Sequence, residues 1–245
     1  MQKRVAWVTG GTGGIGTAIC RGLADAGYQV VAGYSNAEKA KAWQEEQKAA
    51  GYDLAISHAD IADFDSVRKS FEEIQQQFGA VSVLVNNAGI TRDGMLKKMQ
   101  PDQWRDVLST NLDSVFNTSK ACLDAMLEQQ YGRIINISSI NGEKGQMGQT
   151  NYSAAKAGMH GFTKALAQET ARKGITVNTI SPGYIATDMI MKIEEKIRES
   201  IRAQIPVGRF GEPEDIARLV VFLADEASSF ITGANISANG GQFMH

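Results

Sequence analysis

The sequence is poor in cysteine, proline and histidine, and each scarcity excludes a class of protein. The two cysteines, Cys20 and Cys122, are too few and too far apart for a disulfide scaffold, so we expect buried free thiols in a reducing compartment. Four prolines in 245 residues leave no proline-rich linker that would separate two domains. The three histidines, His58, His160 and His245, share no spacing typical of metal ligands. We therefore expect no protein-bound catalytic metal.

Charge and hydropathy exclude two further classes. The formal net charge is -2, and no cluster of basic residues stands out that could neutralise phosphates, so no nucleic-acid partner is expected. No segment approaches the roughly 18 apolar residues of a membrane-spanning helix, and the first residues lead directly into a strand-like segment rather than a signal peptide. We expect a cytoplasmic protein with no membrane partner.

Short apolar runs alternate with helical patterns along the chain. Because these runs are rich in valine and isoleucine without strict alternation, they are typical of parallel strands buried on both faces. Helices must then cover both faces of the sheet. The sequence predicts an α/β fold, a single doubly wound (Rossmann) domain over residues 1–245 with a seven-stranded parallel sheet flanked by helices on both faces. The predicted strands are Val5–Val8, Gln29–Ala32, Leu54–Ser57, Val81–Val85, Ile134–Ile137, Thr176–Ile180 and Ala234–Ser237.

Glycine and proline agree with these boundaries. Pro101 and Pro213 stand where a helix can begin, since the first turn needs no N–H donor. Residues 188–211, between the sixth strand and the last helix, have a helical pattern with mixed charge, and we predict that they form a lid over the substrate. Four glycines stand where a helix should end before the next strand: Gly27, Gly51, Gly79 and Gly174.

The first predicted strand ends in a glycine-rich turn, and a helix follows it. Such a turn lets backbone N–H groups approach a pyrophosphate, whose charge the helix N-terminus favours. The spacing is Gly-x-x-x-Gly-x-Gly rather than the commoner Gly-x-Gly-x-x-Gly. In the first strand-to-helix turn of this pattern, we predict a dinucleotide site formed by Gly10, Thr12, Gly13, Gly14, Ile15 and Gly16.

The end of the second strand bears on which dinucleotide binds. An acidic residue here would bind the ribose 2′-hydroxyl of NAD and repel the 2′-phosphate of NADP. The sequence has no acidic residue between Val30 and Asn36, and it also lacks the usual arginine. We predict NADPH as cofactor, with Tyr34 and Ser35 among its contacts.

Small residues also follow the fourth strand. Asn86 is followed by Asn87, Ala88 and Gly89, which permit close approach of a ring. We predict that these three residues contact the adenosine and ribose side of the cofactor.

The decisive pattern is a tyrosine and a lysine four residues apart, Tyr152 and Lys156, downstream of Ser138-Ser139. On a helix, residues at this spacing share one face. A tyrosine with a pKa of about 10 is a poor acid–base catalyst near neutral pH, and a nearby ammonium favours the phenolate and lowers that pKa. A serine hydroxyl could hold the substrate oxygen. In combination with the upstream serine and the glycine turn, the pattern indicates an acid–base catalytic site beside the dinucleotide.

Together these motifs resemble the short-chain dehydrogenase/reductase family over the whole chain. The resemblance rests on Thr9–Gly16, Asn86–Gly89, Asn111, Ser139, Tyr152, Lys156 and Pro182-Gly183. It implies that Tyr152 donates the proton, that Lys156 binds the nicotinamide ribose and lowers the tyrosine pKa, that Ser139 positions the substrate oxygen, and that Asn111 holds a water in the proton relay.

The resemblance also implies further contacts and an assembly. It places Asp60 and Ile61 at the adenine, and Pro182, Gly183, Ile185 and Thr187 around the nicotinamide. Family members usually form homotetramers, in which the helices around residues 102–128 and 153–172 would pack across the interface.

Within the family, the residues around the site are similar to those of acetoacetyl-CoA reductases of polyhydroxybutyrate synthesis. The similarity lies in Gly89–Asp93, Asn141–Tyr152 and Ser181–Asp188. It implies NADPH-dependent reduction of acetoacetyl-CoA, an acyl-CoA, to (R)-3-hydroxybutanoyl-CoA. The amides of Gln146 and Gln149 could donate to the thioester carbonyl, and we predict Asp93, Ser139 and Tyr184 as further substrate contacts.

Three alternatives stay open. The 3-oxoacyl-[acyl-carrier-protein] reductases share much of this pattern, but Gln129-Gln130 stands here where carrier-protein enzymes tend to have basic residues that attract an acidic carrier. Against this, two basic residues, Arg172 and Lys173, remain near that position. The second alternative is a non-catalytic nucleotide-binding sensor, which would have no need of the complete set of catalytic residues. A family member acting on a sugar or a steroid ranks below both thioester readings.

Overall fold

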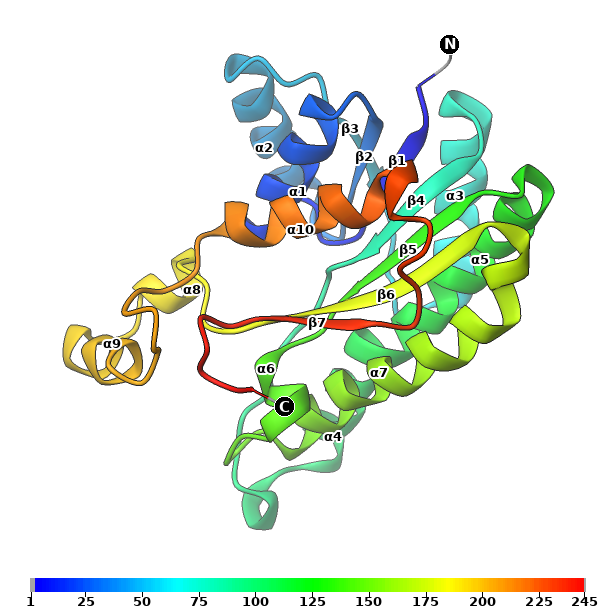
Figure 1. Cartoon of the computed structure of the whole chain (residues 1–245). Coiled ribbons are helices and arrows are strands. Elements are labelled where there is room, and N and C mark those ends of the chain that lie inside the picture. Colours follow the sequence, from blue (N-terminus) through cyan, green and yellow to red (C-terminus); the bar gives the residue numbers. More distant parts are fainter. Residues whose placement is uncertain (1–2, 245) are drawn as a thin grey trace.

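The computed structural model describes residues 3–244, so residues 1, 2 and 245 of the predicted domain lie outside it. Seven parallel strands form one sheet in the order β3-β2-β1-β4-β5-β6-β7 (Figure 1). The predicted single α/β domain with a seven-stranded parallel sheet is confirmed, and the strand ends differ from the predicted ends by at most two residues. The strands are β1 (Val5–Val8), β2 (Gln29–Tyr34), β3 (Ala55–His58), β4 (Val81–Asn86), β5 (Gly132–Ile137), β6 (Ile175–Pro182) and β7 (Asn235–Ala238).

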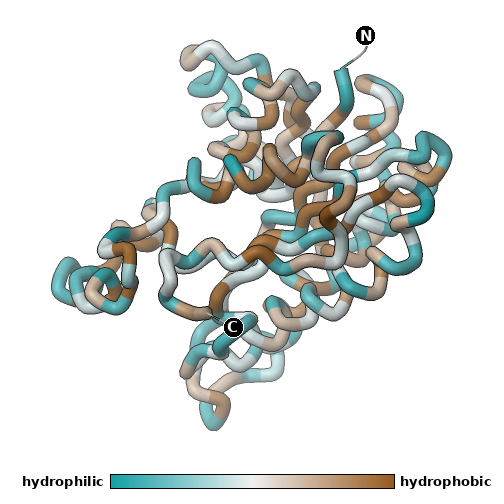
Figure 2. The backbone as a smooth tube through the Cα atoms, in the orientation of Figure 1, coloured by the Kyte–Doolittle hydropathy of each residue, from teal (hydrophilic) through white to brown (hydrophobic). Residues whose placement is uncertain are grey.

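Helices cover both faces of the sheet. One apolar cluster joins the sheet to α1 (Gly14–Asp25), α2 (Ala37–Ala49) and α10 (Pro213–Ala224). A second cluster joins the opposite face to α3 (Phe64–Phe78), α5 (Ser114–Gln129) and α7 (Thr150–Thr170). Hydrophobic residues are accordingly concentrated in the strands and in the helices that pack on them (Figure 2). Within residues 3–244, no helix is both long and apolar enough to cross a membrane.

Glycine and proline end and start helices as their backbone chemistry requires. Pro101 and Pro213 occupy the first turn of α4 (Pro101–Leu108) and α10, each next to a capping box. Gly174 ends the α7 region in the left-handed conformation, with φ of 73°. A Cβ at Gly174 would lie 2.3 Å from the carbonyl oxygen of Gln130, so both the dihedral angle and the space demand glycine.

The strand order reverses between β1 and β4, because β2 lies on one side of β1 and β4 on the other. The chain therefore continues from β1 to a helix on one face of the sheet and from β4 to helices on the other face, which leaves a crevice at the carboxyl ends of the strands, where doubly wound folds bind ligands. A cavity of about 960 Å³ occupies this position. The strand order thus determines that the candidate site lies at the carboxyl ends of β1 and β4.

The predicted lid contains two short helices, α8 (Asp188–Met191) and α9 (Glu195–Arg202), which project beside the ends of β6 and β7 (Figure 1). Main-chain hydrogen bonds close the base of this segment. Ala186 N donates to Gly211 O at 2.7 Å, and Gly211 N donates to Tyr184 O at 2.9 Å. The segment is therefore a loop pinned at its base, and its action as a lid stays a prediction.

Candidate active site

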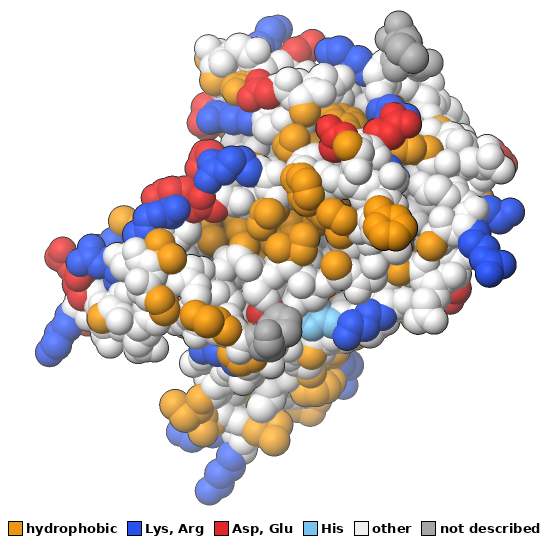
Figure 3. All heavy atoms as spheres, in the orientation of Figure 1, with side chains coloured by type: hydrophobic (Ala, Val, Ile, Leu, Met, Phe, Trp, Pro, Cys, Tyr) orange, Lys and Arg blue, Asp and Glu red, His pale blue; other side chains and the backbone are white. Residues whose placement is uncertain are grey.

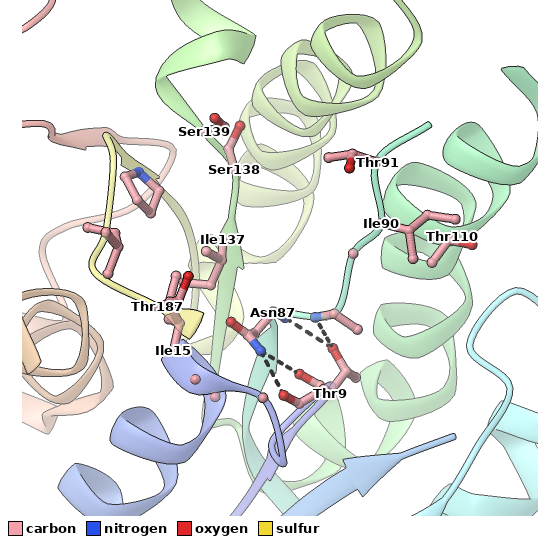
Figure 4. A pocket seen from close by; sticks show the side chains of 18 of the residues that line it. Thr9, Ile15, Asn87, Ile90, Thr91, Thr110, Ile137, Ser138, Ser139 and Thr187 are labelled. Atoms are coloured by element: carbon pink, nitrogen blue, oxygen red, sulfur yellow. Dashed lines mark hydrogen bonds between the residues drawn. The ribbon is translucent and has the colours of Figure 1, made fainter. Parts of the chain in front are cut away.

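The glycine turn and the segment after β4 form one wall of the cavity. The side chain of Asn87 donates to Thr9 O at 3.0 Å and to Gly10 O at 3.1 Å (Figure 4). The hydroxyl of Thr9 accepts from the backbone N–H groups of Asn87 and Ala88, at 3.0 and 3.1 Å. These bonds tie the loop after β4 to the loop after β1. A Cβ at Gly16 would lie 2.2 Å from Gly10 O, so the turn can only be built from glycine there.

The cavity is lined by the residues that the sequence predicts for a dinucleotide. It extends from the ends of β2 and β3, past the glycine turn and the start of α1, to Tyr152 and Lys156, and its size is ample for such a ligand. The residues present therefore fit a nicotinamide dinucleotide. All predicted cofactor residues border the cavity: Gly10, Thr12, Gly13, Gly14, Ile15, Gly16, Tyr34, Ser35, Asp60, Ile61, Asn87, Ala88, Gly89, Tyr152, Lys156, Pro182, Gly183, Ile185 and Thr187.

Asn111 lies behind the cavity wall, in a π-helical turn (Ser109–Asp113) between α4 and α5. It is fully buried, and its amide accepts from Ile90 N and donates to Ile90 O, both at 2.8 Å. Such π-turns within helical segments are frequent at functional sites. A Cβ at Gly89 would lie 3.1 Å from Asn111 Oδ1 and 3.6 Å from Lys156 Nζ, which places Asn111 close to the reacting end of the cavity.

The two serines at the end of β5 point to different partners. Ser139 caps α6 (Ile140–Lys144), where its hydroxyl accepts from Asn141 N at 3.1 Å, and its side chain is also hydrogen-bonded to Tyr152. The Ser138 hydroxyl donates instead to the main-chain oxygen of Lys156 at 2.9 Å. The structure therefore brings Ser139, rather than Ser138, to the tyrosine hydroxyl.

Tyr152 and Lys156 lie one turn apart on α7, with the ammonium 5.6 Å from the tyrosine ring centroid. Lys156 is 3% exposed, and this burial lowers its pKa to about 7, while Nζ donates to Ile137 O at 2.7 Å. Burial also raises the pKa of Tyr152, against the lowering effect of the hydrogen bond with Ser139; the Asp93 carboxylate raises it further.

The direction of the tyrosine shift is therefore opposite to the expected lowering by lysine. Burial of the phenol dominates, and a lysine whose own pKa is close to neutral carries only part of a positive charge at pH 7. Tyr152 consequently stays protonated near neutral pH, which is the state that a proton donor needs.

The predicted substrate residues separate into two groups. Ser139, Gln149 and Tyr184 line the cavity. Gln149 is held between two partners, since it donates to Asp93 Oδ2 at 2.8 Å and accepts from Asn141 Nδ2 at 2.9 Å. Asp93 itself does not border the cavity and is linked to it through its hydrogen bond with Gln149.

Gln146 does not border the cavity, and its amide oxygen accepts from Lys144 Nζ at 3.3 Å. Sequence reasoning missed Asn141, Thr91 and Ile190, which do line the cavity. The Asn141 contact with Gln149 depends on the fold of the loop between α6 and α7, and no spacing in the sequence indicates it.

Metal ligands are scarce around the site. Among residues 3–244, no three side chains of His, Cys, Asp or Glu come together in a way that could hold a metal ion, and His245 lies outside these residues.

Comparison with known proteins agrees with this architecture. The family model adh_short_C2, described as enoyl-(acyl carrier protein) reductase, matches residues 10–242. The chain is 54% identical over 245 residues to the acetoacetyl-CoA reductase of Cupriavidus necator, and the match covers all of both chains. It is 46% identical over 244 residues to the 3-oxoacyl-[acyl-carrier-protein] reductase of Pseudomonas aeruginosa, covering 100% of this chain and 99% of the relative. The chain therefore belongs to the short-chain dehydrogenase/reductase family.

Proposed function

We propose that the protein reduces the 3-oxo group of acetoacetyl-CoA with NADPH, giving (R)-3-hydroxybutanoyl-CoA for polyhydroxybutyrate synthesis. The chain is an oxidoreductase that acts on CH–OH groups. The observation that carries the finer proposal is the meeting of Ser139, Tyr152 and the amide of Gln149 at one end of the cavity. The relative from Cupriavidus necator, which is 54% identical and is named as an acetoacetyl-CoA reductase, supports acetoacetyl-CoA as the substrate.

The two hydroxyl groups define where the carbonyl would bind. Because Ser139 and Tyr152 are hydrogen-bonded to one another, one carbonyl oxygen can accept from both. NADPH, when bound, supplies the hydride to the carbonyl carbon. Tyr152 donates its proton as negative charge develops on the oxygen, and Ser139 stabilises that charge; a fixed donor of this kind is often worth about 3–4 kcal/mol.

The remaining catalytic candidates hold these groups in place. We propose that Lys156 binds the nicotinamide ribose and stabilises the charge left on Tyr152 after proton transfer, since its ammonium lies on the same helix face. We also propose that Asn111 holds a water in the proton relay. Its amide, bonded on both sides to the backbone of Ile90, keeps this turn fixed beside Gly89.

The cofactor proposal leads to a test at the last residue of β2. Tyr34 borders the cavity at the position where an acid would select NAD. Replacing Tyr34 with aspartate should lower the ratio of kcat/KM for NADPH to that for NADH by about 10-fold or more, since one added charge repels the 2′-phosphate at short range with on the order of 1–4 kcal/mol. Steady-state kinetics with both cofactors measures this ratio.

The neutral variant Tyr34→Asn is the matched control, because it removes the same ring without adding a charge. It should keep most of the NADPH preference of the wild type. If both variants change the ratio equally, the ring of Tyr34 rather than the absence of an acid determines the preference.

The acyl carrier is tested directly by comparing acetoacetyl-CoA with the same acyl group on acyl carrier protein. Gln129 is exposed, and its amide accepts from Ser82 Oγ at 3.0 Å and donates to the carbonyl of Ala125 at 3.0 Å, so it is engaged locally and offers no positive charge to an acidic carrier. We expect kcat/KM for the CoA ester to exceed that for the carrier form by roughly 10-fold or more, about 1.4 kcal/mol. Loss of NADPH absorbance measures both rates.

Each outcome of this assay identifies one function. The opposite preference would make the protein a 3-oxoacyl-[acyl-carrier-protein] reductase. NADPH binding without oxidation by either thioester would favour the non-catalytic sensor.

We further propose that the chain assembles as a homotetramer, as family members usually do. A tetramer with dihedral symmetry needs two different interfaces. Trp104 on α4 and Phe116 on α5 leave 41% and 55% of their surface exposed. On another side of the molecule, hydrophobic side chains gather over α10 (Figure 3), and Phe222 and Phe230 expose 51% and 101%. Exposed aromatic side chains at two separate places support this assembly.

A further inference from the structure

We propose that His160 is a positioning residue for the catalytic pair: it holds the Ser138 hydroxyl against the main chain of Lys156 and so fixes α7 to the end of β5. The inference rests on the proposed function, because it takes Tyr152 and Lys156 to be the catalytic residues. The contacts that support it adjoin the cavity at Ser138 and Lys156 and include none of the predicted substrate residues.

His160 continues the helix face on which the catalytic residues lie. Tyr152, Lys156 and His160 follow one another at intervals of four residues, so all three share one face of α7. That face packs on the ends of β5 and β6. Lys156 is hydrogen-bonded there to two consecutive residues, the last residue of β5 and the one after it. Its Nζ donates to Ile137 O at 2.7 Å, and its main-chain oxygen accepts from Ser138 Oγ at 2.9 Å.

The neighbouring hydrogen bonds determine the role of the imidazole. His160 Nε2 lies 3.0 Å from Ser138 Oγ and 3.3 Å from Ser181 Oγ. The hydroxyl proton of Ser138 is already donated to Lys156 O, and that of Ser181 is donated to Asn235 Oδ1 at 2.8 Å. Both serine oxygens can then only accept from the imidazole, so Nε2 must carry a proton and donate to them. His160 thereby orients the Ser138 hydroxyl towards Lys156.

The network is anchored on the far edge of the sheet. Asn235, on β7, accepts from Ser181 through Oδ1 and donates through Nδ2 to Glu143 Oε1 at 2.5 Å. Ser237 donates to the same carboxylate oxygen at 2.5 Å. Glu143 lies on α6, the short helix that Ser139 caps. One continuous chain of hydrogen bonds therefore links the helix that carries Tyr152 to the helix that begins at Ser139.

This link bears on catalysis through the geometry of Tyr152 and Ser139. Their hydrogen bond depends on how α7 sits against the end of β5, and a misplacement of about 1 Å in an active site can cost on the order of 100-fold in rate. The network reaches Lys156 at its main-chain oxygen, which binds no transferable proton. It therefore positions the helix and does not conduct protons.

The test compares two replacements of the same imidazole. His160→Leu removes the N–H donor, whereas His160→Gln keeps an N–H donor on a side chain of similar reach. We expect His160→Leu to lower kcat by roughly 10- to 100-fold with the KM for NADPH changed by less than about 2-fold, and His160→Gln to restore most of kcat. The thioester that the wild type reduces faster serves as substrate.

A second readout needs no substrate. The hydrogen bond with Ser139 lowers the pKa of Tyr152, so loosening α7 should raise that pKa in His160→Leu and leave it near the wild-type value in His160→Gln. Ultraviolet difference titration of each protein against its Tyr152→Phe counterpart isolates this tyrosine. A wild type that reduces neither thioester would contradict the proposed function, while this titration would still decide the role of His160.

A matched control lies one turn further along α7. Thr163 is buried and hydrogen-bonded to Asn136 Nδ2 and Thr179 Oγ1, at 2.8 and 2.7 Å, but it does not contact Ser138 or Lys156. Thr163→Val should lower the melting temperature without lowering kcat or shifting the Tyr152 pKa. If it reproduces the effects of His160→Leu, the role of His160 is merely structural and the proposal is wrong.

A double-mutant cycle tests the order of the contacts. If His160 acts through Ser138, then Ser138→Ala and His160→Leu remove the same link, and the double variant should be about as slow as the slower single variant. If the loss of kcat in the double variant equals the product of the losses in the two single variants, the two residues act independently and the proposed order of contacts is wrong. Unchanged kcat and Tyr152 pKa in His160→Leu would also overturn the proposal.

Discussion

Replacing Tyr152 with phenylalanine should lower kcat by roughly 1,000-fold or more while NADPH binds with nearly wild-type affinity, since a general acid contributes typically about 100- to 10,000-fold. The substitution removes one oxygen atom and keeps the ring that packs beside Lys156. Because burial keeps the Tyr152 hydroxyl protonated near neutral pH, this hydroxyl is the group best placed to give a proton to the carbonyl oxygen. Steady-state kinetics and fluorescence titration with NADPH measure the two effects.

Tyr131→Phe is the matched control for this variant. Tyr131 lies at the start of β5, far along the strand from Ser139, and its hydroxyl donates to Ala224 O at 3.2 Å. Removing this hydroxyl eliminates its hydrogen bonds with Ala224 O and with the Tyr28 side chain, both remote from Ser139, and should leave kcat unchanged. A Tyr152→Phe variant with substantial turnover would mean that another group donates the proton, and the proposed mechanism would be wrong.

Replacing Lys156 with methionine should abolish most turnover and at the same time stabilise the folded protein near pH 6. Methionine has a similar length and no charge. Wild-type Lys156 is 3% exposed, and burial lowers its pKa from 10.5 to about 7. Below about pH 7 the folded protein therefore holds a buried ammonium, which costs several kcal/mol relative to the ammonium in water.

The dependence on pH follows from the direction of this shift. Between about pH 7 and 10.5 the unfolded chain binds more protons at this lysine than the folded protein does, so the stability of the wild type rises with pH in that range. Methionine removes this dependence. The lost bond from Nζ to Ile137 O costs only about 1 kcal/mol. We expect Lys156→Met to raise the melting temperature by several degrees near pH 6, at about 2–4 °C per kcal/mol, and the difference to shrink towards pH 10.

Thermal unfolding at a fixed protein concentration across this pH range measures the effect. Lys164→Met, an exposed position on the same helix, should show no such dependence. A Lys156→Met variant that is less stable than the wild type at every pH would mean that the bonds of the ammonium outweigh the cost of its burial.

Local patterns were sufficient to predict most of the fold. Short apolar runs located all seven strands, most clearly the inner strands β1, β4, β5 and β6, which are buried along their whole length, whereas the edge strands β3 and β7 are only partly buried. Pro101 and Pro213 marked helix starts for a backbone reason that does not depend on the rest of the chain. The order of the strands in the sheet could not be read in this way, since strand pairing joins distant segments.

The same distinction between local sequence and contacts of distant segments applies to the candidate site. Tyr152 and Lys156 share a helix face whatever surrounds them, and the glycine turn is a local requirement of its backbone. The direction of the tyrosine pKa shift, the partner of each serine, and the positions of Asn141 and Gln146 depend on burial and on loops that meet only in the folded chain. The sequence by itself determined the fold class, the dinucleotide turn and the catalytic helix face. Only the tertiary structure decided the protonation state of Tyr152 and the network of His160, because desolvation and contacts between distant segments exist only after folding.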